Sequence, residues 1–321
     1  MTTLLNVVRE RTYMFVLGLS VVLLVANIIV LPAFAYPSQI PATLGTLAPL
    51  GIVGMASTPA FLSGGGGVDL SLAPLMGLVN IVMVTQLLNT DLGSPLIAVP
   101  IVLALGGAVG AVNGAIVTIL RFPPVIATLC SFFVLAGVSL KLVPTPVTAR
   151  PNWTDSLAGS IGPVPGALVT IGAPLVLWLW LQRTAFHETL LSVGDNDATA
   201  FSAGVNVIAV RIWAYALGGL IAAVAGIALT GLVRTADANL TGTFVLAAIA
   251  AVALGGSNLG GGRGGLVGSL LGATSIFLLK NFLTAVGVSA FWFQAVYGAV
   301  LLFALLVGAQ LLRRPIQAGA S

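Results

Sequence analysis

Long blocks of apolar residues, separated by short polar connections, run through almost the whole chain. The blocks end at charged residues, proline or asparagine, and a helix needs about 20 apolar residues to cross the hydrocarbon core of a bilayer. This pattern predicts ten membrane spans. They are residues 13–31, 44–63, 70–88, 96–120, 124–143, 166–182, 211–232, 244–256, 265–284 and 291–311. The blocks at 70–88 and 244–256 are short, so they either cross the membrane fully or are partly re-entrant.

Composition removes the main alternatives to a helical membrane protein. Charged residues make up 6% of the 321 residues and hydrophobic residues 58%, whereas about 25% of the residues of an average soluble domain are charged. A transmembrane β-barrel would alternate apolar and polar residues in segments of about 10, and stretches such as residues 244–254 are apolar throughout. The sequence therefore predicts an all-α polytopic membrane protein.

The remaining polar composition gives little sign of a ligand-binding domain. The twelve Lys and Arg residues are scattered along the chain and never exceed a pair, whereas a nucleic-acid site clusters them on one face. The single cysteine, Cys130, excludes an internal disulfide and a metal cage built from cysteines. We therefore expect no nucleic-acid partner, no metal and no cofactor.

The distribution of basic residues predicts the orientation, because cytoplasmic connections carry an excess of Lys and Arg. An even number of spans returns both termini to one side. With cytoplasmic termini, eight basic residues lie inside, namely Arg9, Arg11, Arg121, Arg183, Arg211, Arg263, Arg313 and Arg314. Four lie outside, namely Lys141, Arg150, Arg234 and Lys280. The largest connections, 144–165 outside and 182–210 inside, leave no room for a soluble catalytic domain, so residues 1–321 are expected to form one transmembrane domain.

A glycine pattern suggests an internal repeat. Gly106, Gly107, Gly110 and Gly114 recur 158 residues later as Gly264, Gly265, Gly268 and Gly272. Since the first set runs inward and the second outward, the pattern predicts an inverted repeat of spans 2–5 and 7–10. Chance in a glycine-rich chain is the alternative. Either way, glycines at every fourth position predict helix stripes that pack closely on a neighbour, and the stripe residues are Gly106, Gly110, Gly114, Gly264, Gly268 and Gly272.

Two glycine-rich connections interrupt the apolar blocks. Residues 63–71 read SGGGGVDLS, where the glycines cannot form a stable helix and the segment is either a flexible turn or part of a pathway. Residues 255–265 formally match the dinucleotide pattern G-x-G-x-x-G. They lack the βαβ context of that motif, so we interpret them as a tight turn beside a packed neighbour.

The inner connection at about 183–210 contains a predicted short helix. Asp195 or Asn196 is suited to its N-cap, residues 198–203 favour helix, and Gly204 is suited to a positive φ after its last turn. Ala198 and Phe201 are then available for contact. The segment is either a docking element for a soluble partner or a plain interfacial helix.

Four polar or aromatic residues are candidates for lining or gating a translocation pathway, since polarity inside a membrane is costly. They are Asp69, Asn113, Asn281 and Trp292. The alternatives are capping of the third span by Asp69 and interhelical packing for the others. Lys280, near the outer end of its span, is expected to extend its amine to the interface.

Several catalytic signatures are absent from the sequence. No G-x-x-x-x-G-K-[ST] loop, H-E-x-x-H or G-x-S-x-G motif occurs, and no pair of intramembrane carboxylates is present. The chain is therefore expected to be non-catalytic, with any ATP hydrolysis performed by another chain.

Four groups of motifs resemble the permease subunits of ribose-type sugar ABC importers, a family that includes the xylose, galactose and autoinducer-2 permeases. They are GGVDLS at 66–71, GAVNG at 110–114 with RFPPVIATL at 121–129, VGDNDA at 193–198 with SAGV at 202–205, and AIAAVALGG at 248–256 with GGRGGLVG at 261–268 and FW at 291–292. They occur in the family's order and cover most of the chain.

The resemblance implies a permease in the bacterial cytoplasmic membrane that moves a sugar or sugar-like solute inward by alternating access. It implies two ATPase subunits, an extracytoplasmic solute-binding protein and a second permease chain, identical or related. Coupling to the ATPase would involve Gly194, Asp195, Asn196, Ala198, Phe201 and Gly204. The alternative is a secondary transporter or facilitator that works alone, for which a cluster of ion-coupling residues at mid-membrane would be diagnostic.

Overall fold

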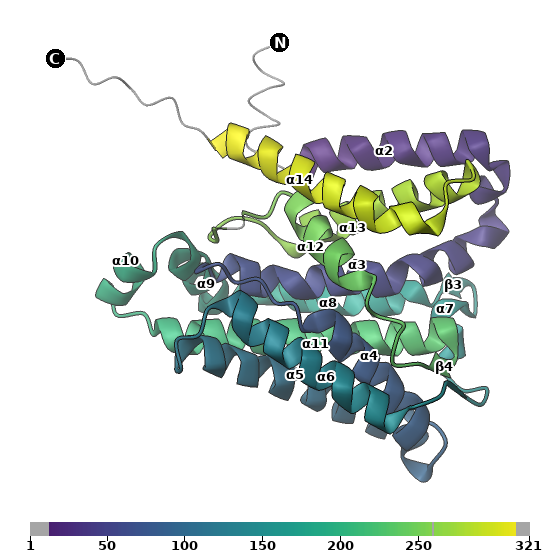
Figure 1. Ribbon diagram of the computed structural model, residues 1–321, viewed down its shortest axis with the longest axis horizontal. Coiled ribbons are helices and arrows are strands. Elements are labelled where there is room, and N and C mark those ends of the chain that lie inside the picture. The colour runs from purple at the N-terminus through teal and green to yellow at the C-terminus, as the bar shows by residue number, and fades with distance from the viewer. Residues whose placement is uncertain (1–12, 259, 313–321) are drawn as a thin grey trace.

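The described residues fold mostly into helices. The structure is a computed structural model that describes residues 13–258 and 260–312 (Figure 1). Each of the ten predicted blocks contains one main helix. These are α2 (Tyr13–Val30), α3 (Ile40–Leu62), α4 (Leu72–Val82), α5 (Pro95–Thr118), α6 (Pro124–Leu142), α8 (Ala167–Leu181), α11 (Val207–Val233), α12 (Phe244–Leu254), α13 (Leu266–Ala285) and α14 (Phe293–Leu312).

Shorter elements join these helices. The helical ones are η1 (Pro32–Ala35), η2 (Pro37–Gln39), the π-helix η3 (Met83–Leu87), η4 (Asp91–Gly93), α7 (Asp155–Ala158), α9 (Ala185–Asp195), α10 (Asp197–Ser202) and η5 (Ala290–Trp292). Four two-residue strands form two antiparallel pairs. They are β1 (Val147–Thr148) with β4 (Thr235–Ala236), and β2 (Ser160–Ile161) with β3 (Val164–Pro165).

The all-helical class is confirmed, while the number of membrane crossings stays a prediction. Among the described residues, five helices are long and apolar enough to cross a membrane: Pro37–Leu62, Pro95–Thr118, Pro124–Leu142, Val207–Val233 and Leu266–Ala285. A sixth span results if α8 and α9, bent by 86°, count together. The apolar stretches at α2, α4, α12 and the start of α14 are shorter.

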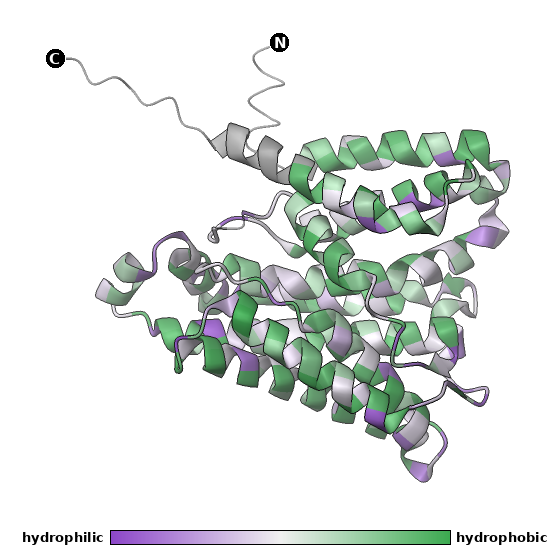
Figure 2. Cartoon of the chain, viewed as in Figure 1, coloured by the Kyte–Doolittle hydropathy of each residue, from purple (hydrophilic) through white to green (hydrophobic). Residues whose placement is uncertain are grey.

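Helices α11 and α3 form the centre of the bundle. Helix α11 packs against α3, α4 and α5, and α3 also packs against α12 and α13. In its most apolar stretch, α11 is 72% buried, whereas α5 and α6 are each 22% buried. Figure 2 shows that hydrophobic residues nevertheless cover the outer helices. An apolar surface of this kind is suited to lipid or to another membrane chain.

Helix α2 is attached to α13 by buried polar contacts. The hydroxyls of Ser20 and Ser275 lie 2.8 Å apart. The Asn27 amide donates to the carbonyl of Leu278 at 2.9 Å and to its own helix at Leu23. A helix near the start of the described residues therefore packs with one near their end.

The glycines of α5 bring its backbone against that of α11, as the stripe predicts. A Cβ added at Gly106 would overlap the carbonyl oxygen of Gly219, and one added at Gly110 would overlap that of Tyr215. Gly114 meets the same helix one turn further along. No side chain larger than hydrogen fits at these three positions without separating the helices.

The second glycine stripe is only partly a helix stripe. Gly268 and Gly272 of α13 pack on α12, where an added Cβ would overlap the carbonyl oxygens of Gly255 and Ala251. Gly264, with a φ of 141°, lies before α13, so its assignment to the stripe was wrong. The residue belongs to the turn that leads into the helix.

The glycine match does not mark equivalent positions of the predicted repeat. Its two sets are 158 residues apart, and they pack on α11 and α12, which are not counterparts in that repeat. The four pairs of counterpart helices begin at Ile40 and Val207, Leu72 and Phe244, Pro95 and Leu266, and Pro124 and Phe293, and the two starts of each pair are 167, 172, 171 and 169 residues apart, respectively. The helices of the predicted repeat are thus spaced by about 170 residues, which differs from the glycine spacing of 158.

The connections gather at two opposite ends of the bundle, visible at the left and right of Figure 1. We call one the glycine end; it comprises connections 63–71, 119–123, 183–206 and 255–265 and carries α10. We call the other the strand end; it comprises connections 88–94, 143–166 and 234–243 and carries β1 and β4. The two largest connections lie at opposite ends, as the predicted topology requires.

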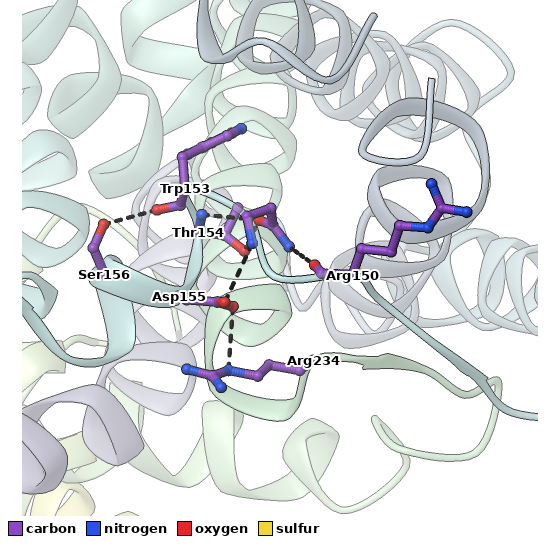
Figure 3. A network of polar contacts seen from close by, with 7 residues as sticks. Arg150, Trp153, Thr154, Asp155, Ser156 and Arg234 are labelled. Atoms are coloured by element: carbon purple, nitrogen blue, oxygen red, sulfur yellow. Dashed lines mark hydrogen bonds and ion pairs between the residues drawn. The ribbon is translucent and has the colours of Figure 1, made fainter. Parts of the chain in front are cut away.

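Side-chain hydrogen bonds hold the strand end together. Asn152 and Asp155 organise the turn before α7, where the Asn152 carbonyl oxygen accepts from the Thr154 amide at 2.9 Å. Asp155 also pairs with Arg234 at 3.1 Å (Figure 3). The indole N–H of Trp153 donates to the carbonyl of Gly93 at 2.9 Å. Three connections that are distant in sequence are thereby joined.

Candidate functional site

The connection 183–206 folds into two short helices, and α10 projects from the bundle at the glycine end (Figure 1). The Asn196 carbonyl oxygen accepts a hydrogen bond from the Thr199 amide at 3.0 Å, which caps α10. Gly204 follows the helix with a φ of 86°, a conformation that glycine adopts at little cost. The predicted short helix, its N-cap and its glycine stop are confirmed.

The residues of α10 divide into an exposed set and an anchor. Ala198 and Phe201 are exposed, Phe201 to 73%, and so are Asp195 and Asn196 at the start of the helix. Ala200 is buried against the bundle. An exposed aromatic side chain on a short capped helix is a feature that protein-binding surfaces commonly use.

Gly194, one of the residues expected to take part in coupling, does not lie in α10. It lies inside α9, which continues to Asp195, and it is buried. A Cβ at this position would overlap both the carbonyl oxygen of Leu62 and the amide nitrogen of Gly262. Gly194 therefore packs α9 against the bundle, a contact that periodicity within the loop cannot reveal.

Three connections meet at this point through their backbones, in a set that we call the glycine junction: Gly64, Gly194, Gly261 and Gly262. The Gly262 amide donates to the carbonyl of Leu62, at the end of α3, over 3.1 Å. A Cβ added at Gly64 would lie 2.8 Å from the Gly194 carbonyl oxygen. Because these backbones are in direct contact, α9 has no room to move closer to the end of α3 or to the turn before α13.

A chain of buried polar groups runs beside the glycine junction. The Asp69 carboxylate accepts from the Ser71 amide at 2.9 Å and from its hydroxyl at 2.6 Å. The Asn113 amide donates to the Ser71 hydroxyl at 2.7 Å, and the Asn113 carbonyl oxygen accepts from Ser131. This series of hydrogen bonds links connection 63–71 to α5 and α6. Two of the predicted pathway residues, Asp69 and Asn113, are thereby brought together.

The Asp69 carboxyl is only partly satisfied. It is 4% exposed, and its second oxygen has no hydrogen-bond partner among the described residues. Burial raises the pKa of this carboxyl to about 6, and the hydrogen bonds from Ser71 act against that rise. The site therefore holds a carboxyl group at a cost in free energy that depends on pH.

The other two predicted pathway residues lie elsewhere. Asn281 lines a separate cavity of about 370 Å³ between α2, α3 and α13, together with Thr46 and Thr284. Trp292 is 58% exposed and meets Phe291 edge to face, with ring centroids 5.8 Å apart. Asn113 itself is buried, with both ends of its amide bonded. The structure thus does not assemble the four candidates into one site.

Sequence reasoning missed several residues beside Asp69. Thr128 accepts from the Leu70 amide at 3.2 Å, and Arg211 donates to the Ser63 carbonyl at 3.2 Å and pairs with Asp197 at 3.1 Å. Tyr215 is buried, and its hydroxyl has no partner within the described residues. Thr128 lies on α6, and Arg211 and Tyr215 lie on α11, whereas Asp69 lies in connection 63–71, so no spacing within one element could have indicated the group.

Comparison with known proteins supplies the family. Residues 39–305 match the family described as "Branched-chain amino acid transport system / permease component". The chain belongs to this permease family. It is 33% identical to the ribose import permease protein of Bacillus subtilis (strain 168) over 297 residues, which cover 91% of this chain and 90% of the relative. No solved structure matches the chain.

Two further relatives agree with this assignment. The ribose import permease protein of Escherichia coli (strain K12) is 35% identical over 248 residues, covering 75% of this chain and 77% of the relative. An inner membrane ABC transporter permease protein of the same organism is 31% identical over 280 residues, covering 85% and 83%. The chain is thus a permease subunit of an ABC importer, a multi-pass protein of the bacterial inner membrane and a non-catalytic component of its transporter.

Proposed function

We propose that this permease moves a sugar or sugar-like solute into the cytoplasm and receives its driving force from separate ATPase subunits docked on α10. One observation carries the proposal: α10 presents Phe201 to solvent, while the preceding helix is locked by backbone contacts to the bundle. A partner that moves α10 therefore moves α9 and, through the glycine junction, α3 and α13. The sugar is inferred from the ribose import relatives.

In this mechanism the bundle alternates between an outward-facing and an inward-facing orientation. The two orientations differ in the tilt of the helices that meet at the glycine junction. Closure of the ATPase subunits on ATP would favour one orientation, because the nucleotide-bound dimer fits only one separation of the docked helices. The solute then needs only a weakly polar path between orientations, since a tight site would slow its release. No nucleotide binds to the permease itself.

Ten spans with cytoplasmic termini and an inverted repeat complete the proposal. The glycine end carries Arg121, Arg183, Arg211 and Arg263, whereas the strand end carries Arg150 and Arg234 and is approached by Lys141 and Lys280, which supports a cytoplasmic glycine end. Exchange of the two halves would turn the contacts of α3 with α11, α12 and α13 into contacts of α11 with α3, α4 and α5. Both sets of contacts are present, which supports the repeat.

The proposal also includes the partners that ABC importers use. A solute-binding protein would dock on the strand end, where the hydrogen-bonded turns offer a fixed surface. A second permease chain, identical or related, would cover part of the apolar face that α5 and α6 leave exposed. The solute would pass between the two chains or beside them.

The test is uptake and ATPase activity of the reconstituted transporter with changes in α10. Phe201→Asp should lower uptake and uncouple ATPase activity from the loaded binding protein, because a charge in an apolar socket loses hydration without gaining a partner. Phe201→Leu, which keeps an apolar contact, should retain most of both activities. All variants should reach the membrane in normal amount.

A second pair of variants separates the backbone conformation from side-chain size. Gly204→Val forces a β-branched residue to a positive φ and should distort the end of α10. Gly242→Val adds the same side chain where the space is equally open and no positive φ is needed, so it should be tolerated. A facilitator would be favoured if Phe201→Asp and Gly204→Val both kept normal uptake and ATPase activity that responds to the loaded binding protein. Uptake by the permease chain alone would also favour a facilitator.

A further inference from the structure

A cavity of about 410 Å³ lies at the glycine end, between connections 63–71 and 119–123 and the first turns of α11. We call it the arginine cavity, after Arg121 and Arg211, which both line it. Gly64, Gly65 and Tyr215 also contribute to its walls. The function proposed above assigns no role to this cavity. The positive charge and the unpartnered donors of the cavity therefore need another explanation.

The charged groups that line the arginine cavity are both cations. Arg121 forms no ion pair with the described residues, and its backbone takes a φ of 58°, which is uncommon for a residue with a side chain. Arg211 pairs with Asp197 through one terminal nitrogen and donates to Ser63 through Nε. One guanidinium charge is therefore balanced and the other is not.

Further hydrogen-bond donors at the cavity have no acceptor in the described chain. Tyr215 is 1% exposed, and its hydroxyl has no hydrogen-bond partner. The amide of Gly65, whose φ is 64°, likewise donates no hydrogen bond. Leaving the buried Tyr215 hydroxyl unpaired costs about 1–3 kcal/mol, which an acceptor in the cavity would offset, and the exposed amide of Gly65 could donate to the same acceptor.

The two nearby carboxylates do not cancel this character. Asp197 pairs with Arg211, and Asp69 interacts electrostatically with Tyr215. Neither carboxylate lines the cavity. A ligand there meets two guanidinium groups, an amide and a hydroxyl, a set rich in donors and in positive charge.

We propose that the arginine cavity binds a phosphate group. A tetrahedral phosphate offers acceptor oxygens in several directions, and a guanidinium group donates to two of them at once. The group can come from an anionic lipid of the cytoplasmic leaflet or from soluble phosphate. Because Arg211 also contacts Asp197 of α10, occupancy of the cavity would change how firmly α10 is held.

The experiment uses the full chain in nanodiscs and measures the midpoint of thermal unfolding. In the first arm, discs of phosphatidylcholine are titrated with inorganic phosphate, against chloride at equal ionic strength. In the second arm, discs that contain phosphatidylglycerol are compared with pure phosphatidylcholine discs in the absence of phosphate. A ligand that binds the folded state raises the midpoint according to its concentration and affinity.

Three variants make the result specific to the arginine cavity. Arg121→Gln should weaken binding of the effective probe at least about tenfold, since a hydrogen-bonded charge pair is lost. Tyr215→Phe, which removes the unpartnered hydroxyl at nearly constant volume, should weaken it by about the same factor. Arg183→Gln removes an exposed arginine of the same end that does not line the cavity, and should leave binding unchanged.

The two arms distinguish the sources of the phosphate group. A rise with inorganic phosphate that Arg121→Gln removes supports a soluble ligand, and a rise confined to phosphatidylglycerol discs supports a lipid headgroup. The proposal is overturned if neither probe raises the midpoint of the parent chain. An equal loss in Arg183→Gln and Arg121→Gln also overturns it, because the effect would then be general surface charge.

Discussion

The glycine end and the strand end hold the same helices by different means. At the glycine end, the backbones of α3, α9 and the turn before α13 touch directly at Gly64, Gly194 and Gly262. At the strand end, short strand pairs and side chains such as Trp153 and Asp155 bridge the connections. The first kind of contact depends on the absence of side chains and the second on their presence.

This difference has a mechanical meaning. A backbone contact between glycines limits how closely two segments approach but places few directional bonds across them, so it resists tilting less than a hydrogen-bonded contact does. Hydrogen bonds and strand pairs fix distance and direction together. We therefore expect the segments at the glycine end to tilt more easily than those at the strand end.

The largest test of this contrast is Gly194→Ala. A single added methyl would overlap the backbone of two other connections, and we expect a loss of roughly 4 kcal/mol in the free energy of unfolding, at the upper end of overpacking effects. Chemical unfolding of the full chain in micelles measures it. Gly172→Ala is the matched control, since an added Cβ meets nothing within 4 Å there; equal stability of the two variants would remove the distinction between the ends.

The second test uses pH. The raised pKa of Asp69, about 6 against an ordinary 3.8, means that the folded state binds its proton more tightly than the unfolded state. Its contribution to stability is therefore complete below about pH 4 and is lost as pH rises through 6, a difference of roughly 2–3 kcal/mol. Asp69→Asn should flatten this pH dependence; an unchanged slope between pH 4 and 7 would show that the carboxyl is not buried as described.

At the strand end we expect smaller losses in the free energy of unfolding, because several separate bonds hold the connections and each contributes only a part of the stability. Trp153→Phe removes the hydrogen bond to Gly93 and keeps most of the ring. We expect a loss of about 1 kcal/mol in the free energy of unfolding. A loss as large as that of Gly194→Ala would mean that the strand end is as sensitive as the glycine end.

The smallest effect is expected for the ion pair between Asp155 and Arg234. The Arg234 side chain is 59% exposed, so water and salt screen the pair. Arg234→Gln should cost about 0.5 kcal/mol at low salt, and the difference from the parent should shrink as salt is added. A cost that is larger and independent of salt would indicate that the pair is buried by a partner.

The sequence predicted the parts of this fold that depend on local pattern. Apolar blocks located all ten main helices, and cap chemistry located α10 between Asn196 and Gly204. The contact between Gly194 and Leu62 was missed, because a close approach of distant backbones leaves no periodic trace. The glycine spacing of 158 residues was a poor guide to the predicted repeat for a related reason. Glycines mark close packing on any neighbouring helix, and the two sets pack on helices that are not counterparts in that repeat.

The candidate site shows the same limit. Asp69 and Asn113 were recognised because polar residues are conspicuous in an apolar chain, and they proved to be linked through Ser71. Tyr215 and Arg211 were not recognised as part of the same region, since an aromatic or basic residue near the end of a span has an ordinary explanation. Only the packing of α11 on α5 and on connection 63–71 reveals their place.

The pairing of α2 with α13 sets an order for biosynthesis. Asn27 and its acceptor Leu278 are 251 residues apart, so at about 5–20 residues per second the ribosome needs roughly 12–50 s to supply the partner. During that interval Ser20 and Asn27 face the bilayer or the insertion machinery, with Asn27 bonded only within its own turn. Helix α2 therefore reaches its final neighbour only after α13 has been made, long after α2 itself has left the ribosome.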